Sequence, residues 1–405
     1  MKITWKENLV MILAVLAVLV IMTGCEYDAP TAMYYQDQAT YLTPVISEII
    51  PADVAPAGAN TITIRGTDLK SDSGSVSVYF DNVMAEMLNA TSTELLVRRP
   101  NLVSDAAVVK VVSDASLVVV RQENYKIESV IESYGGFLDG ERHSVLAVDN
   151  DENLYVIQRS PRTVYRIPAD GSDKVVIGEA SKIATDAKMG PNGKLLILMN
   201  NKSIMQMDVT TGEETEWVAV AKKVSFGDFD ANGNFFCAGK KTDLYVVHSD
   251  LSSTASGLYA DHDVYCVRVF GDYVYVLGED TKAGEGDPAI AIWRSKIADA
   301  TGTLNDAELV LDWSTTGEYA DYAPLYMVFD ADGNLYVGSE APSPLFMLTT
   351  QGTFDVMYKE IVPTTASILV WGNGNYLYQI MGGDEWDIKR IDMGKTSAPY
   401  YGRSL

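Results

Sequence analysis

The feature that most constrains the fold is an internal repeat of about 40 residues that fills the C-terminal two thirds of the chain. Six segments each place two apolar runs around a short turn: VLAVDNDENLYVIQ, ATDAKMGPNGKLLILM, FGDFDANGNFFCAG, VRVFGDYVYVLG, YMVFDADGNLYVGS and LVWGNGNYLYQI. The residues just before the second run are Asn153, Lys194, Asn234, Asp272, Asn334 and Asn375, at separations of 41, 40, 38, 62 and 41. Hairpins at this period, with further strands in each unit, predict a β-propeller of six blades.

Most copies continue into a third strand, as in TVYRIPADG and PLFMLTTQG. The repeat resembles the NHL-type propellers, which implies that residues 128–405 form a six-bladed ring. Only 12 residues follow Met393, too few for a good fourth strand in the last blade. We therefore expect the closing strand to come from the apolar segment 129–137, because joining the two ends in this way removes an exposed sheet edge.

Residues 44–127 show a different pattern, in which short alternating runs are separated by Pro and Gly. Period-two alternation at this spacing predicts a small β-sandwich. Its marked positions are Pro44, Ile46, Ile49, Pro51, Gly58, Gly66 and Val78-Tyr79-Phe80. This set resembles the IPT/TIG family of immunoglobulin-like domains, with one departure at Asp81, where the family commonly has Gly. The expected fold class is all-β, an Ig-like sandwich followed by a six-bladed propeller.

Residues 1–24 have the pattern of a signal peptide, with Lys2 and Lys6 before an uncharged run of 14 residues at 9–22. This run is shorter than the ~20 residues of a membrane-spanning helix. The tetrapeptide Met22-Thr23-Gly24-Cys25 resembles the lipobox of bacterial lipoproteins, which implies cleavage before Cys25 and its acylation; an uncleaved anchor is the alternative. Glu26 stands where inner-membrane retention favours Asp, so an outer-membrane address is expected. Residues 25–43 would form a tether with a reach of about 25 Å.

The net charge limits the classes of partner that are expected, and the cysteine pattern indicates whether a disulfide is expected. The formal net charge is −24, and it becomes −25 when residues 1–24, which carry two lysines and one glutamate, are removed. Nucleic-acid binding is not expected, because it requires a basic patch that neutralises phosphates. Cys237 and Cys266 lie in apolar strand patterns, so buried free thiols are expected, with a disulfide as the alternative.

Few motifs carry catalytic or metal chemistry. The turns that begin at Asp149, Asp230 and Asp330 place oxygens at alternate residues, as calcium loops do, but they lack the bidentate Glu of such loops. Asn-Gly and Asp-Gly are ordinary hairpin turn residues, so structural turns are expected. His262 lies between two aspartates, an arrangement able to raise an imidazole pKa, but a solvated turn is the preferred interpretation. No cofactor, metal or catalytic residue is expected.

Loop lengths are more informative than motifs. Connections after the second and fourth strands of each blade lie on the face opposite the Asp-rich turns, and insertions there are expected at 278–288, 299–324, 340–344 and 382–386. Aromatic rings that stack on sugars, with carboxylates and arginine for their hydroxyls, suit a glycan. The candidate ligand-binding residues are Arg159, Glu279, Trp313, Tyr319, Tyr322, Glu340, Asp384 and Trp386. Loop packing and a protein interface are the alternatives.

The order of lipobox, TIG-like sandwich and propeller resembles surface lipoproteins of polysaccharide-utilising bacteria. The resemblance implies a non-catalytic outer-membrane lipoprotein, anchored at Cys25, that binds a polysaccharide, oligosaccharide or other extracellular ligand beside an outer-membrane transporter complex. The cell surface is favoured over the periplasmic face. Two alternatives stay open: an adhesion or scaffold protein that binds another envelope protein, and a hydrolase or lyase with carboxylates in the propeller channel.

Overall fold

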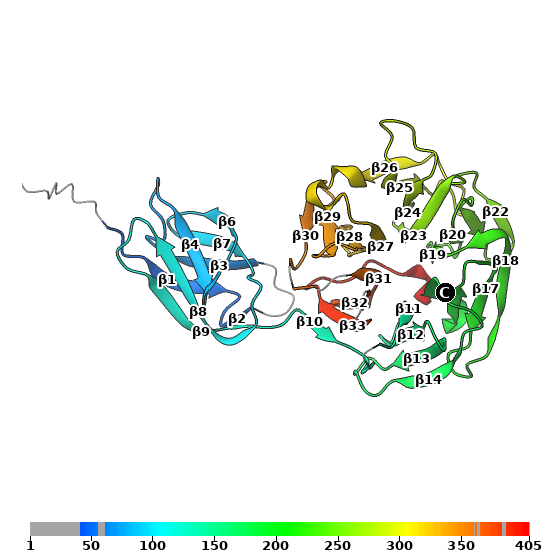
Figure 1. The fold of residues 1–405 in the computed structure, drawn as a ribbon, viewed down its shortest axis with the longest axis horizontal. Coiled ribbons are helices and arrows are strands. Elements are labelled where there is room, and N and C mark those ends of the chain that lie inside the picture. The colour runs from blue at the N-terminus through cyan, green and yellow to red at the C-terminus, as the bar shows by residue number, and fades with distance from the viewer. Residues whose placement is uncertain are drawn as a thin grey trace, which may run out of the picture.

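A computed structural model describes residues 41–55, 61–138, 140–359, 361–362, 365–382 and 386–404. The expected signal peptide, Cys25, most of the tether and Asp384 lie outside the described residues. Figure 1 shows two bodies side by side, a sandwich formed by the first part of the chain and a ring of sheets formed by the rest. In the part that the structure describes, no helix is long and apolar enough to cross a membrane.

The sandwich consists of two facing sheets. The first has the order β1 (Val45–Ile50), β3 (Thr61–Thr67), β7 (Glu94–Arg98), β6 (Met87–Ala90). The second has the order β2 (Val54–Ala55), β9 (Val120–Ile127), β8 (Ser104–Ser113), β4 (Val76–Phe80), β5 (Val83–Met84). Alternate residues of the central strands, such as Ile62 and Ile64 in β3, are buried between the sheets, as the period-two pattern predicts.

The turn after β4 shows how the chain accommodates its departure from the family pattern. Asp81 has a φ of 52°, in the left-handed region that favours glycine. Its side chain compensates, because Asp81 Oδ1 accepts a hydrogen bond from the backbone amide of Val108 at 2.9 Å. Asp therefore replaces Gly at this turn without disturbing the pairing of β4 with β8.

The ring consists of six four-stranded sheets, which confirms the predicted propeller. Blade one contains β11 (His143–Val148), β12 (Leu154–Gln158), β13 (Thr163–Ile167) and β14 (Val175–Glu179). Blade two contains β15 (Asp186–Met189), β16 (Leu195–Leu198), β17 (Asn201–Met207) and β18 (Glu214–Val224), with the short helix η1 (Pro191–Gly193) in its first turn. Blade three contains β19 (Phe226–Phe229), β20 (Phe235–Ala238), β21 (Tyr245–Val247) and β22 (Ser253–Ala255).

The remaining blades follow the same antiparallel order. Blade four contains β23 (His262–Phe270), β24 (Tyr273–Asp280), β25 (Ile290–Lys296) and β26 (Glu308–Asp312), followed by helices η2 (Trp313–Thr315) and η3 (Gly317–Tyr319). Blade five contains β27 (Pro324–Phe329), β28 (Leu335–Ser339), β29 (Leu345–Leu348) and β30 (Phe354–Val356). Blade six contains β31 (Ala366–Trp371), β32 (Tyr376–Met381), β33 (Ile388–Asp392) and β10 (Ile131–Ser133).

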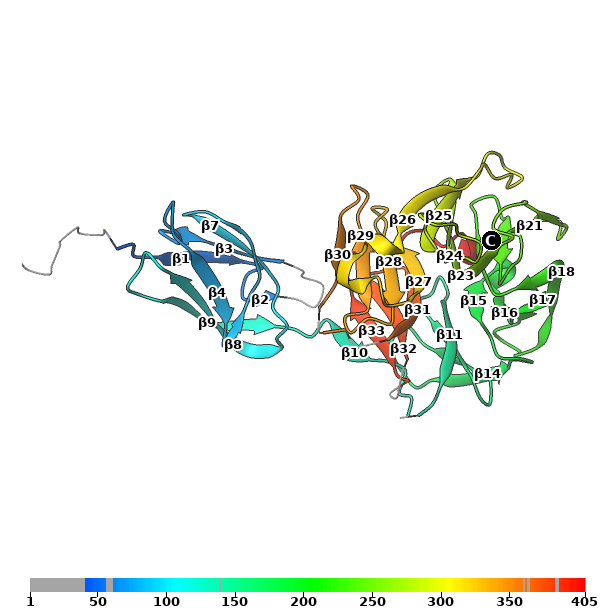
Figure 2. The same ribbon diagram turned by 45° about the horizontal axis from the view of Figure 1, so that its top comes forward.

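The ring is closed by a strand from its N-terminal side. β10 lies within the expected segment 129–137 and pairs with β33, so that Ile131 faces Ile391 and Ser133 faces Lys389. The first strands of blades six and one, β31 and β11, are in contact and complete the circle. Figure 2 shows β10 beside β33 at the side of the ring nearest the sandwich.

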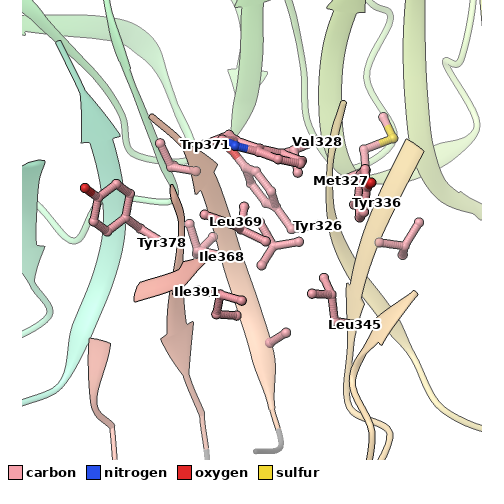
Figure 3. Close-up of a cluster of buried hydrophobic side chains, with 14 of the residues drawn as sticks. Tyr326, Met327, Val328, Tyr336, Leu345, Ile368, Leu369, Trp371, Tyr378 and Ile391 are labelled. Carbon is pink, nitrogen blue, oxygen red and sulfur yellow. The ribbon is translucent and has the colours of Figure 1, made fainter. Parts of the chain in front are cut away.

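Apolar side chains fill the spaces between blades. Figure 3 shows the cluster between blades five and six, where Tyr326, Tyr336, Ile368 and Trp371 come together. The Tyr336 and Trp371 rings meet edge to face at 5.1 Å between centroids. Second strands are largely apolar on both faces because each blade lies between two others, and all four residues of β16 are buried.

The sandwich contacts the ring at blade five. Arg98, at the end of β7, forms ion pairs with Glu86 at 2.9 Å and with Asp355 in β30 at 3.0 Å. The Asn101 amide donates to the carbonyl of Lys359. These contacts, together with the short link from β9 to β10, hold the two bodies beside each other.

Candidate functional site

Strand direction gives the propeller two faces. Because the strands of each blade alternate in direction, the first-to-second and third-to-fourth connections lie on one face, which we call the turn face. The second-to-third connections and the links between blades lie on the opposite face, which we call the loop face. The Asp-rich turns lie on the turn face, and the candidate ligand-binding residues that the structure describes lie on the loop face.

Four candidate residues form a loop cluster beside blade five. Trp313 is only 1% exposed, and its indole Nε1 donates to the carbonyl of Tyr322 at 2.8 Å. Tyr319 packs against Phe346 at 4.8 Å between ring centroids. Tyr322 is 36% exposed, and the neighbouring Glu340 is also exposed. Trp313 and Tyr319 thus anchor the loop, whereas Tyr322 and Glu340 are presented to solvent.

Glu279 is held by a tyrosine that the sequence reasoning missed. Tyr265, in the first strand of blade four, donates its hydroxyl to Glu279 Oε2 at 2.9 Å. Burial, and then the Glu279 carboxylate, raise the pKa of Tyr265. The hydroxyl therefore stays protonated and keeps one carboxylate oxygen in a fixed position, which leaves Glu279 Oε1 as the available acceptor for a ligand.

A third group lies where blade six meets blade one. The guanidinium of Arg142 lies over the Trp386 ring, 4.9 Å from its centroid. The backbone amide of Arg159 donates to the Arg142 carbonyl at 2.7 Å, and the Arg159 side chain is exposed. The Trp386 carbonyl accepts from His143 Nδ1 at 3.0 Å, and burial lowers the pKa of this histidine. Arg142 immediately precedes β11 and His143 begins it. No sequence motif marks either residue as part of a site.

One expected insertion is divided between the two faces. The sequence reasoning placed the whole of 299–324 on the loop face, but β26 lies inside it and pairs with β25. Residues 297–307 are therefore a third-to-fourth connection on the turn face, where the Asn234 amide donates to the Ala300 carbonyl at 3.0 Å. The expectation that all of this segment lies on the loop face was wrong, because Glu308–Asp312 forms the fourth strand of blade four.

Buried ionic residues lie along the axis of the ring, on the first strands of the blades. Near the loop face, the Tyr326 hydroxyl donates to Asp186 Oδ1 at 2.7 Å. Lys188 Nζ contacts the same Asp186 oxygen at 3.2 Å and the Tyr326 hydroxyl at 2.5 Å. Burial and Asp186 raise the pKa of Tyr326 well above its usual range. The carboxylate, ammonium and hydroxyl thus satisfy one another.

A second ionic pair lies nearer the turn face. Arg268 is fully buried, and its Nη1 lies 2.6 Å from Asp228 Oδ2. Burial alone would lower the pKa of Arg268, but the Asp228 carboxylate raises it, so the guanidinium stays charged. The sequence does contain a sign of these buried ionic pairs. Charged residues interrupt the apolar first strands in ATDAKMG, FGDFD and VRVF.

Residues after β33 cover this pair. They cross the turn face, where the Ala331 amide donates to the Thr396 carbonyl at 2.9 Å, and end in η4 (Tyr401–Ser404) at the centre of the ring (Figure 1). The Tyr400 ring lies 3.9 Å from the Arg268 guanidinium. We call residues 394–404 the C-terminal segment.

Arg403 in this segment binds both sides of the seam between the last blade and the first. Its Nε donates to the Val148 carbonyl of β11 at 2.7 Å, and its Nη2 donates to the Trp371 carbonyl of β31 at 2.6 Å. The C-terminal segment thereby covers the turn-face side of the channel. The ring seam is fixed at its inner edge by the same contacts.

The Asp-rich turns use their carboxylates internally. Asp330 Oδ1 accepts from the Asn334 amide at 2.8 Å, and Oδ2 accepts from Asn334 Nδ2 at 2.8 Å and from the Tyr336 hydroxyl at 3.0 Å. Asp149 makes the same contacts with Asn153 and Tyr155. Within the described residues, no group of three or more His, Cys, Asp or Glu side chains is arranged to hold a metal ion.

The remaining candidates for chemistry are half-buried, in the case of His262, or fully buried, in the case of the two cysteines. His262 packs against Trp293 at 4.7 Å between centroids, and burial lowers its pKa despite Asp280 and Asp261. The interpretation of this histidine as part of a solvated turn was therefore wrong, because it begins β23 and packs on blade four. Cys237 and Cys266 are both free and fully buried. Burial raises the pKa of Cys266 to about 12, so it stays a thiol.

Comparison with known proteins agrees with this architecture. Residues 44–126 match the IPT/TIG domain family. No curated protein sequence matches the chain. An auxiliary nutrient binding protein from Bacteroides thetaiotaomicron is 13% identical with a TM-score of 0.50, and the match covers 86% of this chain and 97% of that one.

Other similar structures include enzymes and binding proteins. The calcium-binding protein regucalcin from Agrobacterium tumefaciens is 15% identical with a TM-score of 0.51, covering 65% of this chain and 93% of that one. A luciferin-regenerating enzyme is 13% identical with a TM-score of 0.51, covering 67% of this chain and 98% of that one. At these identities the likeness concerns the fold alone. The chain therefore combines an IPT/TIG domain with a six-bladed propeller.

Proposed function

We propose that this protein is a non-catalytic outer-membrane lipoprotein that binds a glycan or other extracellular ligand on the loop face of its propeller. The observation that carries the proposal is the set of accessible groups around that face. Tyr322 and Trp386 offer aromatic surface, while Arg159, Glu279 and Glu340 offer charged hydrogen-bonding groups. Sugars need this combination, because their C–H faces stack on rings and their hydroxyls require directional partners.

Some candidate residues pack the loops while others are exposed, and this difference supports a preformed binding surface. Trp313 and Tyr319 are used in packing, and Tyr265 and Arg142 hold Glu279 and Trp386 in place. A ligand would therefore meet side chains whose conformations are already restricted, which lowers the entropy cost of binding. Similarity of fold to an auxiliary nutrient binding protein is consistent with such a role.

The buried channel gives no support to the hydrolase or lyase alternative. Asp186 and Asp228 are each engaged by a cation, and the C-terminal segment covers the turn-face side of the channel. A catalytic carboxylate needs access to substrate and an unengaged oxygen or proton. We therefore assign the acidic residues of the channel to stability.

The membrane part of the proposal rests on Cys25 and the lipobox-like sequence before it. Acyl chains on this residue would hold the protein at the outer membrane, with the cell surface favoured. The sandwich then lies between the anchor and the propeller along the chain. This order suits a ligand taken from outside the cell and passed to an outer-membrane transporter complex.

A glycan array followed by isothermal titration calorimetry tests the binding proposal. We expect the chain from residue 26 onward to bind at least one polysaccharide. Trp386→Ala combined with Tyr322→Ala should weaken binding tenfold or more, with an unchanged thermal unfolding midpoint. Tyr273→Ala is the matched control, because its ring lies 4.5 Å from the Arg294 guanidinium near the turn face. Absence of binding to any polysaccharide, with an envelope protein recovered by pull-down instead, would favour the adhesion or scaffold alternative.

A further inference from the structure

An exposed apolar cluster lies at one end of the sandwich. Leu117, Val118 and Val119, in the connection between β8 and β9, are 75%, 60% and 40% exposed. Tyr41, at the start of the described chain, is 55% exposed. We call these four residues the apolar tip. Such a run is unusual on a protein with a net charge of −24, and residues 115–120 contain no charged side chain.

The apolar tip lies at the end of the sandwich away from the propeller. β9 runs from Val120 to Ile127 and then leads directly into β10 of the ring, so the connection before Val120 is at its far end. Figures 1 and 2 show this end of the sandwich where the described chain begins. The Leu42 amide donates to the Ala115 carbonyl at 2.9 Å, and Leu42 bridges Ser116. The tip and the N-terminal entry of the chain are therefore adjacent.

We propose that the apolar tip contacts a lipid bilayer. This inference rests on the anchor in the proposed function, because 16 residue steps separate Cys25 from Tyr41. At a maximum of ~3.5 Å per residue, Tyr41 lies within about 56 Å of an acylated Cys25, however that segment runs. The membrane is then the surface that faces this end of the sandwich, and apolar side chains exposed there enter the interface between headgroups and acyl chains.

The chemistry of the tip fits a lipid surface better than a soluble ligand. Leu117 to Val119 carry no hydrogen-bonding side chain, so they offer no specificity for a sugar or peptide. Asp114, the nearest acidic residue along the sequence, is engaged by the amide and hydroxyl of Ser75 at 2.8 and 3.1 Å. Arg121 follows the run and is exposed, where it can contact lipid phosphates. A short apolar tip beside a basic residue is suited to shallow insertion.

Two buried cysteines make a site-specific probe possible. Cys237 and Cys266 are fully buried, and Cys25 is acylated in the proposed lipoprotein, so Val118→Cys supplies a single accessible thiol. The variant, carrying an environment-sensitive fluorophore, is reconstituted into vesicles of phosphatidylethanolamine and phosphatidylglycerol. We expect a blue shift and quenching by brominated lipids. Val176→Cys, 61% exposed on blade one, is the matched control and should show neither.

A second measurement removes the dependence on acylation. With the chain from residue 26 onward as the parent, which lacks both Cys25 and the apolar run 9–22, Leu117→Ser, Val118→Ser and Val119→Ser together should lower vesicle co-sedimentation at least fivefold. Val175→Ser with Val176→Ser should not lower it, and thermal unfolding shows whether each variant is folded. Equal co-sedimentation of parent and tip variant overturns the proposal, as does a dimer of the parent that the tip variant loses. Absence of palmitate labelling at Cys25 refutes the anchor separately.

Discussion

The two faces of the propeller are built on different principles. On the turn face, an Asp carboxylate is bound by the Asn and Tyr that follow it in the same hairpin, in blades one and five alike, and the C-terminal segment covers the centre. On the loop face, each blade has its own connection, and rings and charges remain exposed. The repeat therefore encodes stability, while departures from the repeat supply the surface available for binding.

The largest expected effect is at the centre of the ring. Asp228→Ala leaves the fully buried Arg268 without its counter-ion, so we expect a loss of about 4 kcal/mol in the free energy of unfolding. Chemical denaturation measures this loss. Asp228→Leu combined with Arg268→Met should recover most of the stability, because both charges are then removed. A single variant as stable as the wild type would contradict the importance of the pair.

The next effect distinguishes two tryptophans of the loop face. Trp313→Ala removes a buried ring that contacts Phe346 and Phe354, with an expected cost of about 3 kcal/mol. Trp386→Ala removes a partly exposed ring and should cost less than about 1 kcal/mol. Thermal unfolding of both variants, side by side, checks the difference. Equal destabilisation would mean that Trp386 is also a packing residue.

A smaller effect is expected in the repeated turns. Asp330→Ala leaves the Asn334 amide and the Tyr336 hydroxyl without their acceptor, and we expect a loss of about 2 kcal/mol. Asp332→Ala is the matched control, because its side chain is 72% exposed and contacts only Lys395, at 3.0 Å, among the ion pairs of this turn. Denaturant midpoints measure both variants. If the control were destabilised as strongly, the internal carboxylate contacts would not explain the turn.

The fold was predictable because its signals repeat or alternate. Six similar hairpins predicted six blades, and the shortage of chain after Met393 predicted that an N-terminal strand closes the ring. The site was less predictable, because composition does not distinguish a ring that anchors a loop from one that faces solvent. Trp313 and Trp386 each follow an acidic residue in an expected insertion, yet the Trp313 indole is buried and donates to the Tyr322 carbonyl, whereas the Trp386 ring is contacted by Arg142. Such partners depend on the tertiary structure.

The C-terminal segment also determines the order in which the propeller can form. Blade six needs β10, which is synthesised before blade one, and the seam needs Arg403, which is synthesised after all six blades. A chain stalled during synthesis or export therefore lacks the contacts that complete the ring. A purification tag or fluorescent protein fused after this segment would emerge at the centre of the turn face, which leaves the loop face unobstructed for binding measurements.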